Sequence, residues 1–587
     1  MTKTNLLKIC LPVLFGITSA VLYSCKKEPD KTPPTTTIPP IETPVIDSSY
    51  FDTGEQCRMA VDAMYITLSS QLLYQRGTEA LDMLSDDAEK GGSLTNVAGY
   101  KSDQPEMYAM ALYDANATNR ITNNFWKEYY RIILQANSLI DLTADRKDVP
   151  AYKEMRAEAR FLRAFVYMDL VKMFGAVPLI TSVIPEAKSL SNREFGSAEG
   201  QIAAIYNFIT SELEAIKGVL PQRQPNTQFG RANDAAVRAY LAKAYLYAED
   251  FAKAYATAKE LITTAKGNYG LEAQYHKVFD FDKTDNEYTI REIVFAIQYV
   301  SNNNYGNGSL YYANNLPYYT CGVPYYYWYG SNSSNIRTID NNPRAIVSAT
   351  GTFRENTSVG YGLVIPTKKL VDAFETGDPR LDMIAKSKET APNGIADSIY
   401  WDGSWQKIAK TTFNTGNYTL KNYLNQAVFN GQLSGKDYIL MRWAEVLLIG
   451  AEAAVRTGNT GDATAWVNEL RERARNSKCT EKAPVMAGYK FSTSAVPANL
   501  TTVSITDVKK ERQKELFCEN GTRYFDLLRW NKTNDGDRIS ADEILSTIGN
   551  DLAGSARVWK PGQKGLFPIP IDEIRAHNGA LIQNTGY

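Results

Sequence analysis

The sequence is poor in histidine and has no paired cysteine motif. Only His276 and His577 occur among 587 residues, which excludes most histidine-dependent catalysis and most transition-metal sites. Six cysteines are present, but none has the Cys-x-x-Cys spacing of a zinc site or a redox motif. The spacing also leaves open the disulfide state of the four cysteines that follow the N-terminal segment: Cys57, Cys321, Cys479 and Cys518.

The chain also lacks an excess of charge of one sign. Lys and Arg together number 64 and Asp and Glu 65, and no block of like charge stands out. Such a balance argues against nucleic acid as a partner, because phosphate backbones are bound by clustered basic residues. After Val21 no apolar run approaches the roughly 20 residues of a membrane-spanning helix. We therefore expect contact with a membrane only through an anchor.

The N-terminal segment has the pattern of a lipoprotein signal. Lys3 and Lys8 precede an apolar run from Ile9 to Val21, and small Ser24 is followed by Cys25. A charged start, a short apolar stretch and a small residue before cysteine predict a signal peptide over 1–24, with acyl chains on Cys25. More than one chain makes a stable anchor. The alternative is an ordinary secretory signal with an accidental cysteine.

The next residues predict a tether and then a helical scaffold. Residues 25–47 are rich in Pro and Thr, which favours an extended spacer without a packed core. From 48 to about 268 the apolar period is helical, and the clearest helix is predicted over 151–174. Gly175 and Pro178 supply stop signals after it. One stripe of this helix is expected to be buried: Met155, Ala159, Leu162, Val166 and Leu170.

Two segments have the residue spacing of a tetratricopeptide helix pair. Residues 241–258 carry small alanines where two helices would cross, with Tyr245 and Phe251 beside them. Residues 450–470 repeat the offsets, with Gly458 at the turn between the helices. Because a single pair cannot bury its own apolar face, such units stack.

Between the helical blocks the sequence changes character. From about 269 to 437 helical periodicity fades, and Asn, Gly, Tyr and Pro accumulate around short strand-like runs such as 292–299. We expect a large insertion of loops and short strands, since long insertions are uncommon unless they are functional. The scaffold resumes over about 438–587, where 507–530 is expected to be helical at least to Glu519. Residues 48–587 are thus interpreted as one domain, mainly α.

Several segments in fixed order resemble one family. They are RAEARFLRA at 156–164 with FGAVPL at 174–179, RANDAAVRAYLAK at 231–243, RWAEVLLIGAEA at 442–453, ERQKELF at 511–517 with RYFDLLRW at 523–530, and FPIP at 567–570 with QNTGY at 583–587. This set is similar to the SusD/RagB family of outer-membrane lipoproteins from Bacteroidetes. The resemblance implies a tetratricopeptide-like helical fold with a looped insertion.

The resemblance also implies a function and a partner. Members of the SusD/RagB family are non-catalytic binders of nutrients, most often oligosaccharides and in some cases peptides. They sit at the cell surface over a TonB-dependent, SusC-like barrel transporter, anchored in the outer membrane by lipid. The matched motifs belong to the scaffold, so no ligand-binding residue carries over from the family.

Ligand contacts must therefore be argued from the residues. Ten of the 25 residues from 305 to 329 are aromatic, against 11% for the chain, and none is charged. Aromatic rings stack on the apolar face of a sugar, while phenol and amide groups form hydrogen bonds with the hydroxyl groups at its rim. Because the segment has no charged residue, a neutral glycan is favoured as the ligand. Packing against the transporter, or inside the insertion, is the alternative. The candidate ligand-binding residues here are Tyr311, Tyr312, Tyr325, Tyr327, Trp328 and Tyr329.

Further candidates are weaker. Trp401 and Trp405 flank a predicted turn, where turn packing competes with ligand contact. Oxygen-bearing side chains over 280–287 could hold calcium, but the EF-hand order is absent and a solvated loop is the better reading. No cofactor is predicted. Three tyrosines of an N-terminal connecting region are the weakest candidates: Tyr100, Tyr108 and Tyr113.

Three function classes remain to be weighed. A neutral-oligosaccharide binder that serves a transporter is favoured, and capture of peptides or protein fragments by the same route is the alternative. A glycoside hydrolase using two carboxylates is a remote third possibility, because paired carboxylates cannot be recognised in a sequence without a structure. No local catalytic signature is present, so we expect no enzyme. The identity of the glycan and of the transporter stays open.

Overall fold

The computed structural model describes most of the chain from Phe51 onward. Described are residues 51–70, 73, 77–91, 105–183, 189–225, 228–279, 290–298, 364–384, 437–477, 495–533, 535–548 and 557–587, with Lys421 and the short strands between 337 and 434. Residues 46–587 form one compact unit. No helix among the described residues has the length and apolar character that crossing a membrane requires.

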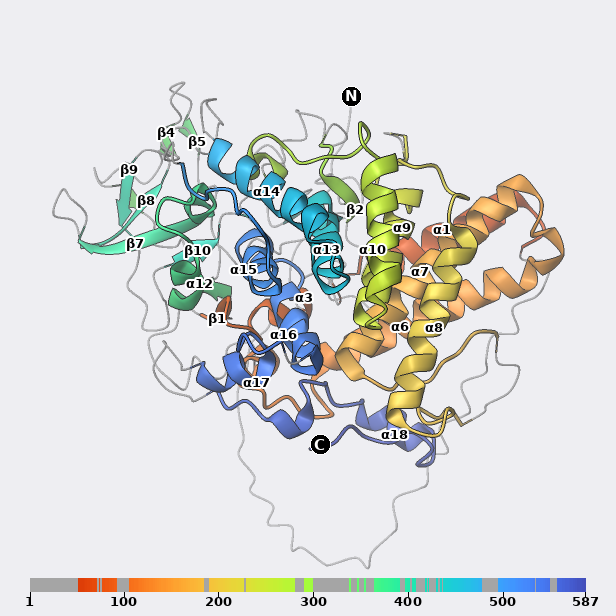
Figure 1. Ribbon diagram of the computed structural model, residues 1–587. Helices are drawn as coiled ribbons and strands as arrows, with labels where there is room; N and C mark the ends of the chain where they lie inside the picture. Colours follow the sequence, from red (N-terminus) through yellow and green to blue (C-terminus); the bar gives the residue numbers. More distant parts are fainter. Residues whose placement is uncertain are drawn as a thin grey trace, which may run out of the picture. The chain divides into compact units, whose positions relative to one another are not determined.

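Helices are the predominant secondary structure of the described residues (Figure 1). They are α1 Gly54–Leu68, α3 Gly77–Asp82, α5 Pro105–Ala111, α6 Arg120–Leu142, α7 Pro150–Phe174, α8 Ala198–Ile216, α9 Asp234–Tyr247, α10 Phe251–Thr264, α12 Lys368–Ala373, α13 Trp443–Arg456, α14 Thr460–Asn476, α15 Ile505–Leu516, α16 Thr522–Thr533, α17 Ala541–Ile544 and α18 Ile571–Ala576. The mainly helical architecture predicted from the apolar period is confirmed.

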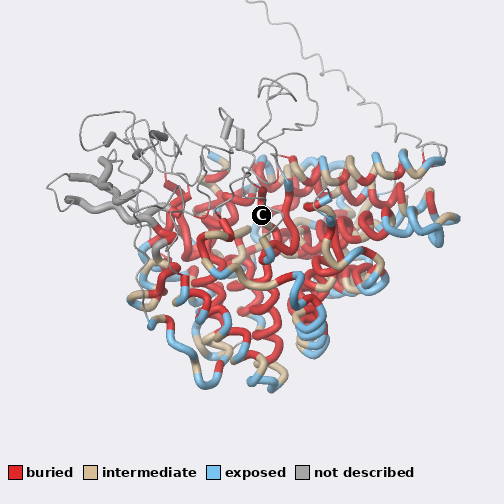
Figure 2. Tube along the Cα trace, turned by 90° about the horizontal axis from the view of Figure 1, so that it is seen from above, coloured by how far each residue is buried: buried red, intermediate tan, exposed pale blue. Residues whose placement is uncertain are grey.

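Helix α7 forms where the period and the stop signals predicted it. Pro150 occupies its first turn, where a missing N–H costs nothing, and Gly175 ends it at φ +69°, a conformation that favours glycine. The predicted stripe from Met155 to Leu170 is buried throughout. Around the helix, aromatic rings meet edge to face, with the Phe161 and Phe295 centroids 5.1 Å apart. Helix α7 thus contributes many residues to the core, and buried residues fill the centre of the helical part (Figure 2).

Three arginines on another face of α7, Arg156, Arg160 and Arg163, bind neighbouring segments. Glu212 of α8 accepts from Arg160 at 2.7 Å and also from Arg163. Arg156 donates to Thr143 Oγ1 at 2.8 Å and to the carbonyl of Ile140. These contacts fix the helices on both sides of α7.

The two predicted helix pairs are present and lie side by side. α9 and α10 form one hairpin, α13 and α14 the other, and α10 packs on α13 (Figure 1). Gly450 permits this approach, because an added Cβ would lie 2.9 Å from the Trp466 ring and 3.3 Å from Ile262. Gly458 forms the inter-helix turn at φ +78°. Asp462 then joins the pairs through Lys259, at 2.7 Å.

The C-terminal helix is shorter than predicted. The sequence indicated helix to Glu519, whereas α15 ends at Leu516 and α16 begins only at Thr522. Cys518 and Asn520 take φ values of 51° and 57° between them. The break brings Gly521 against Leu81 and lets its N–H donate to Asp82 at 2.7 Å. A tertiary contact therefore overrides the local helical pattern.

Short strands occupy the predicted insertion and its ends. β2 Ile293–Ile297 pairs with β13 Tyr438–Arg442, which confirms the strand-like run near 292–299. β1 Ala88–Lys90 pairs with β6 Val364–Pro366. A five-stranded sheet has the order β10 Asn417–Thr419, β7 Ile384–Thr390, β8 Ala396–Trp401, β9 Ser404–Lys407 and β3 Arg337–Thr338. Two small hairpins join β4 Ile346–Val347 to β5 Phe353–Arg354, and β11 Phe429–Asn430 to β12 Leu433–Ser434.

Candidate functional site

Most of the predicted binding residues fall where the structure gives no description. Cys25 and the acidic segment 280–287 lie outside the described residues, as do Tyr100, Cys321 and Cys479. The same holds for the aromatic cluster of 305–329: Tyr311, Tyr312, Tyr325, Tyr327, Trp328 and Tyr329. What the structure does show is the framework on which this insertion is mounted.

Trp401 and Trp405 lie in neighbouring strands of the five-stranded sheet. Trp401 is the last residue of β8 and pairs with Ser404, whereas Trp405 in β9 pairs with Tyr400. Directly opposed residues share a face of a sheet, and successive residues alternate between faces. Positions 401 and 405 therefore belong to opposite faces, while positions 400 and 405 share one.

The ends of the insertion converge on the buried helix α15. A cluster of charged residues, here called the α15 ion cluster, joins them: Glu292, Arg380, Lys421, Arg442, Arg473, Glu511, Glu515 and Glu519. Each of these residues except Glu519 is at most 6% exposed. Glu292 precedes β2, Arg380 precedes β7, Lys421 follows β10, and Arg442 ends β13. Three segments of the insertion and the strand β13 that follows it thus meet one helix.

Glu515 is at the centre of the cluster. Its carboxylate accepts from Arg442 at 2.7 Å, from Arg380 at 3.0 Å and from Arg473. Arg442 also binds Glu292 at 2.7 Å, and Arg473 binds the other oxygen of Glu292 at 3.0 Å. Buried charges are tolerated when they are paired in this way, because desolvation is offset by direct hydrogen bonds.

Lys421 is held by the turn that follows α15. Its ammonium donates to the carbonyls of Glu515 and Phe517, both at 2.9 Å, and to Glu519 at 2.6 Å. It also lies 3.7 Å from the centroid of the Phe517 ring, within cation–π range. The early end of α15 creates this cradle, since a continued helix would use those carbonyls internally.

The cluster holds Glu511 and Glu515 in the ionised state by lowering the pKa of each. Burial alone would raise the pKa of Glu511, but Arg380, Lys514 and Arg471 lower that pKa to about 2. For Glu515, burial is likewise outweighed by Arg473, Arg442 and Arg380, and the pKa is lowered strongly. A glycosidase needs a carboxylic acid that keeps its proton near neutrality. These carboxylates are structural.

One described carboxyl group does titrate near neutrality. Burial and then the neighbouring Asp86 raise the pKa of Asp87 to about 7. Asp86 itself is bound through two oxygens by Arg523, at 2.8 and 3.0 Å. Asp87 accepts from Gln513 at 2.9 Å and is 1% exposed. A substrate cannot reach this pair, so it does not form a catalytic dyad.

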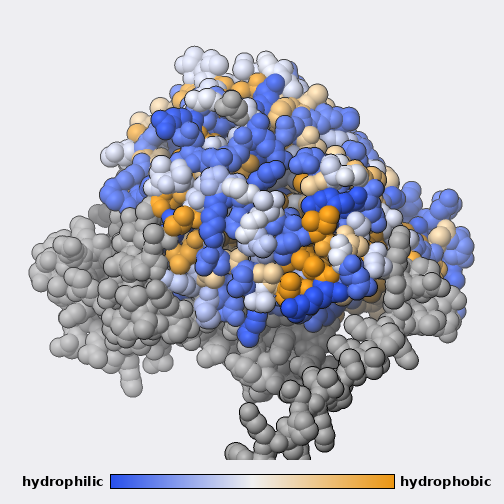
Figure 3. Space-filling model, turned by 90° about the horizontal axis from the view of Figure 1, so that it is seen from below, coloured by the Kyte–Doolittle hydropathy of each residue, from blue (hydrophilic) through white to orange (hydrophobic). Residues whose placement is uncertain are grey.

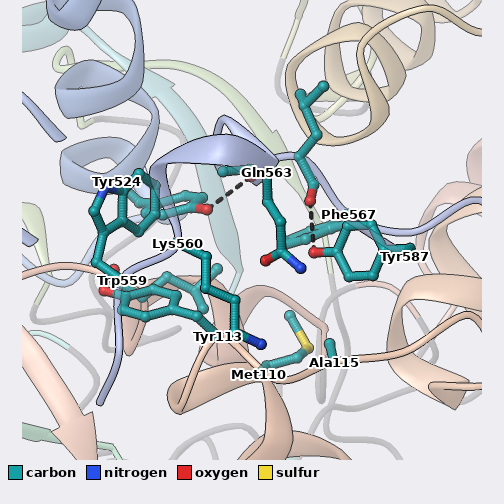
Figure 4. Close-up of a pocket in the computed structure, with 12 residues that line it drawn as sticks. Met110, Tyr113, Ala115, Tyr524, Trp559, Lys560, Gln563, Phe567 and Tyr587 are labelled. Carbon is teal, nitrogen blue, oxygen red and sulfur yellow. Dashed lines mark hydrogen bonds between the residues drawn. The ribbon is translucent and has the colours of Figure 1, made fainter. Parts of the chain in front are cut away.

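The described part of the chain contains an aromatic pocket near the C-terminal segments (Figure 4). Its walls come from the segment around α5, from α16 and from residues 559–587. The Tyr113 and Trp559 rings meet edge to face, with centroids 5.2 Å apart. The cavity measures about 20 Å³, room for little more than a water molecule. We call it the aromatic pocket; it is lined by Leu84, Met110, Tyr113, Ala115, Tyr524, Trp559, Lys560, Gln563, Gly565, Leu566, Phe567 and Tyr587.

The polar groups of the inner wall are already engaged. The Tyr113 hydroxyl donates to the carbonyl of Leu84 at 2.6 Å and accepts from Arg557 at 3.1 Å. Tyr524 donates to the carbonyl of Gly565 at 2.7 Å, and the indole N–H of Trp559 donates to Asp542 at 2.8 Å. A sugar would find few free partners there. Tyr113 was among the weakest sequence candidates, and Tyr108 packs against the core.

Metal-binding and nucleophilic groups do not assemble in the described part of the chain. No three His, Cys, Asp or Glu residues there are placed to hold a metal ion. Cys57 and Cys518 are buried free thiols, and burial raises the pKa of both. Burial lowers the pKa of His276 to about 4. His577 accepts from the backbone N–H of Leu190 at 3.2 Å.

Two groups of residues were missed in the sequence. The α15 ion cluster has no local signature, because its members come from six separate segments. The aromatic pocket had a partial local signature in the sequence, because residues 565–571 form an irregular apolar tail that contains Pro and Phe. That tail supplies Leu566 and Phe567 to the pocket wall.

Models of known families match both halves of the chain. The model described as "SusD family" matches residues 291–587. The model described as "Starch-binding associating with outer membrane" matches residues 50–246. The match thus includes the helical scaffold and most of the insertion.

Relatives and solved structures agree with these models. The starch-binding protein SusD of Bacteroides thetaiotaomicron is 28% identical over 78% of this chain and 76% of its own length. A SusD-like protein of Formosa agariphila is 26% identical over 92% and 94% of the two chains. A laminarin-binding SusD-like protein is similar in structure with a TM-score of 0.67, at 22% identity, over 91% and 99% of the chains. Surface glycan-binding protein A of Bacteroides thetaiotaomicron, solved with laminarihexaose, has a TM-score of 0.63 at 21% identity over 90% and 99%.

Proposed function

Because the chain belongs to the SusD family, we propose that it is a non-catalytic protein that captures neutral oligosaccharides at the outer surface of the cell. One observation carries the proposal: the family matches run through the helical scaffold and through the insertion that the α15 ion cluster anchors. Relatives of this description include a starch binder and a laminarin binder. A SusC-like TonB-dependent transporter is the proposed partner.

The proposed ligand contacts lie on the insertion. The run 305–329 is aromatic and uncharged, which suits the apolar face and hydroxyl rim of a neutral sugar. Trp405 and Tyr400 occupy paired positions on one face of the sheet, and Trp401 belongs to the other face. We therefore assign contact to the 305–329 aromatics together with one face of this sheet. The proposed contact residues are Tyr311, Tyr312, Tyr325, Tyr327, Trp328, Tyr329 and Trp405, while Trp401, on the other face, is proposed to pack at the turn.

The test is calorimetric titration of residues 48–587 with neutral oligosaccharides, acidic oligosaccharides and peptides. We expect one neutral glycan to bind with a dissociation constant between roughly 1 μM and 1 mM. Replacing Trp328 and Tyr329 by Ala should weaken binding at least about tenfold. Phe195→Ala is the matched control, since this exposed aromatic lies outside the insertion.

Two other results would change the conclusion. If the titration shows binding of peptides and no heat from any glycan, the protein captures peptides, not oligosaccharides. Hydrolysis of a glycan by the purified protein would contradict the non-catalytic assignment, and the buried Asp86–Asp87 pair would not explain it.

The anchor is proposed separately. Acylation of Cys25 would tie the domain to the outer membrane through the extended tether of 25–47. Cys25→Ser should release the protein from the membrane fraction and abolish incorporation of labelled palmitate. Retention of the label in that variant would contradict the assignment.

A further inference from the structure

The aromatic pocket has a firm inner wall and a weakly held cover. Tyr113, Tyr524, Trp559 and Phe567 are each at most 8% exposed. Tyr587, in contrast, is 39% exposed, and its hydroxyl is held by donation to the carbonyl of Leu566 at 2.8 Å. Figure 4 shows its ring facing the pocket beside Gln563.

The cover is joined to the fold through a glycine. Asn584 is pinned, because its amide donates to the carbonyls of Phe174 and Phe567 at 2.9 and 2.8 Å. Residues 585–587 beyond it are exposed. Gly586 has φ +92°, and its carbonyl accepts from Gln563 at 3.1 Å. The Tyr587 ring can therefore rotate away while Asn584 stays in place.

We propose that the aromatic pocket binds a phenolic ring, which enters by displacing the side chain of Tyr587. As it stands, the cavity of about 20 Å³ cannot accept any ring. When the side chain of Tyr587 moves away, the phenolic ring of the ligand takes the place of the Tyr587 ring. The hydroxyl of the ligand can then donate to the carbonyl of Leu566, as that of Tyr587 does. The walls match a flat apolar ring, since they are mostly aromatic and aliphatic, with Lys560 and Gln563 as polar members.

A sugar suits this space poorly. The hydroxyls of Tyr113 and Tyr524 and the indole N–H of Trp559 are already bonded within the protein. The hydroxyl groups of a pyranose would therefore be buried without partners, which is costly. This pocket is separate from the insertion, and its ligand differs from the glycan proposed above.

The rim indicates what else the ligand can carry. Lys560 lies at the mouth, paired at 3.0 Å with Asp114, and both side chains are exposed. Exposed pairs contribute little, so the ammonium can exchange Asp114 for a carboxylate on the ligand. The ligand is thus a free phenolic acid, or a phenolic ester carried by a polysaccharide. The ester lacks the carboxylate, so dependence on Lys560 separates the two sources.

The test is titration of the intact chain with 4-hydroxycinnamate and with its sugar ester, followed by ligand-detected NMR. Both the native chain and Tyr587→Ala should bind, and Tyr587→Ala should bind about tenfold more tightly, because no internal ring competes. Cinnamate, which lacks the hydroxyl, should bind more weakly to both. Lys560→Ala should weaken binding of the free acid but not of the ester.

A blocking variant and a spectroscopic signal locate the ligand. Ala115→Leu should fill the cavity and abolish binding, with folding checked by thermal unfolding. In the native chain labelled with 5-fluorotryptophan, the ¹⁹F signal of Trp559, assigned with the Trp559→Phe variant, should shift when the ligand is added. This measurement does not depend on whether Ala115→Leu folds. Failure of binding in both proteins, binding by Tyr587→Ala alone, or an unshifted Trp559 signal would each overturn the proposal. Trp328→Ala should leave phenol binding intact whatever it does to glycan binding.

Discussion

Helices α7 and α15 are both largely buried in the same unit, but the side chains that are buried differ in kind. The inner residues of α7 are largely Ala, Phe, Leu, Val and Met. Those of α15 are largely charged, with Lys509, Glu511, Arg512, Lys514 and Glu515 all buried. Apolar burial is non-directional, so it stabilises α7 without choosing its neighbours closely. Each buried charge requires a partner at one place.

This difference assigns the two helices different tasks. Burial around α7 supplies stability in proportion to the apolar area removed from water. The attraction within the ion pairs of α15 offsets the free-energy cost of removing their charges from water, so these pairs add little net stability. We infer that they specify where the segments around Arg380, Lys421 and Arg442 lie, and hence where the insertion sits. The predictions below test that division.

Glu515→Gln should have the largest effect. The variant keeps the shape of the side chain but leaves Arg380, Arg442 and Arg473 without their shared carboxylate. Breaking a buried ion pair from one side costs roughly 3–5 kcal/mol, which denaturant unfolding can measure. Glu199→Gln, at an exposed pair, is the control and should be neutral. A loss no greater than the control's would contradict the role given to Glu515.

Leu162→Ala should cost roughly 3 kcal/mol, by loss of apolar contact and creation of a cavity on α7. Hydrogen exchange sharpens the comparison with α15. In Leu162→Ala, the strands β2 and β13 should exchange only by global unfolding, whereas in Glu515→Gln they should exchange earlier. Equal exchange patterns in the two variants would show that the ion pairs of α15 do not position the insertion.

Asp87→Asn should have a smaller effect that depends on pH. The pKa of Asp87 is raised from 3.8 to about 7 in the fold, so its contribution is present below pH 3.8 and lost as pH rises through about 7. At pH 8 the Asn variant should be more stable than the native chain, with no gain at pH 4. The contribution of Glu511 to stability depends on pH in the opposite direction. Because its pKa is lowered from 4.5 to about 2, this contribution is lost as pH falls through that range. Denaturant unfolding across this pH range measures both slopes, and a gain at pH 4 would refute the assignment.

Arg160→Ala should have the smallest effect, about 0–1 kcal/mol. Its side chain is 31% exposed, and Glu212 keeps its second partner, Arg163. Arg163→Ala, at a side chain 4% exposed, is the matched comparison and should cost more in thermal unfolding. Equal losses would mean that exposure does not separate the two pairs.

The sequence was informative wherever structure depends on local pattern. Helix α7 was predicted to within one residue because a 3.6-residue period was bounded by proline and glycine. The helix pairs were found because small residues mark their crossings. The positions of Trp401 and Trp405 in two paired strands could not be foreseen, since register is set by strands elsewhere in the sheet.

The rest depended on contacts between distant segments. The break after Leu516 is imposed by Gly521 against Leu81 and Asp82, which lies 439 residues away in sequence. The charges of α15 look like those of a solvated helix until Arg380 and Arg442 are placed beside them. The aromatic pocket joins Tyr113 to Trp559 across a similar distance. No window along the sequence contains such pairs.

The long reach of α15 has a consequence for biogenesis. Its carboxylates come from residues 511–519, yet they fix segments that begin at Glu292. During synthesis, about two hundred residues of scaffold and insertion emerge before the partners that lock them exist. The segments that begin at Glu292 can therefore reach their final positions only after residues 511–519 have been made.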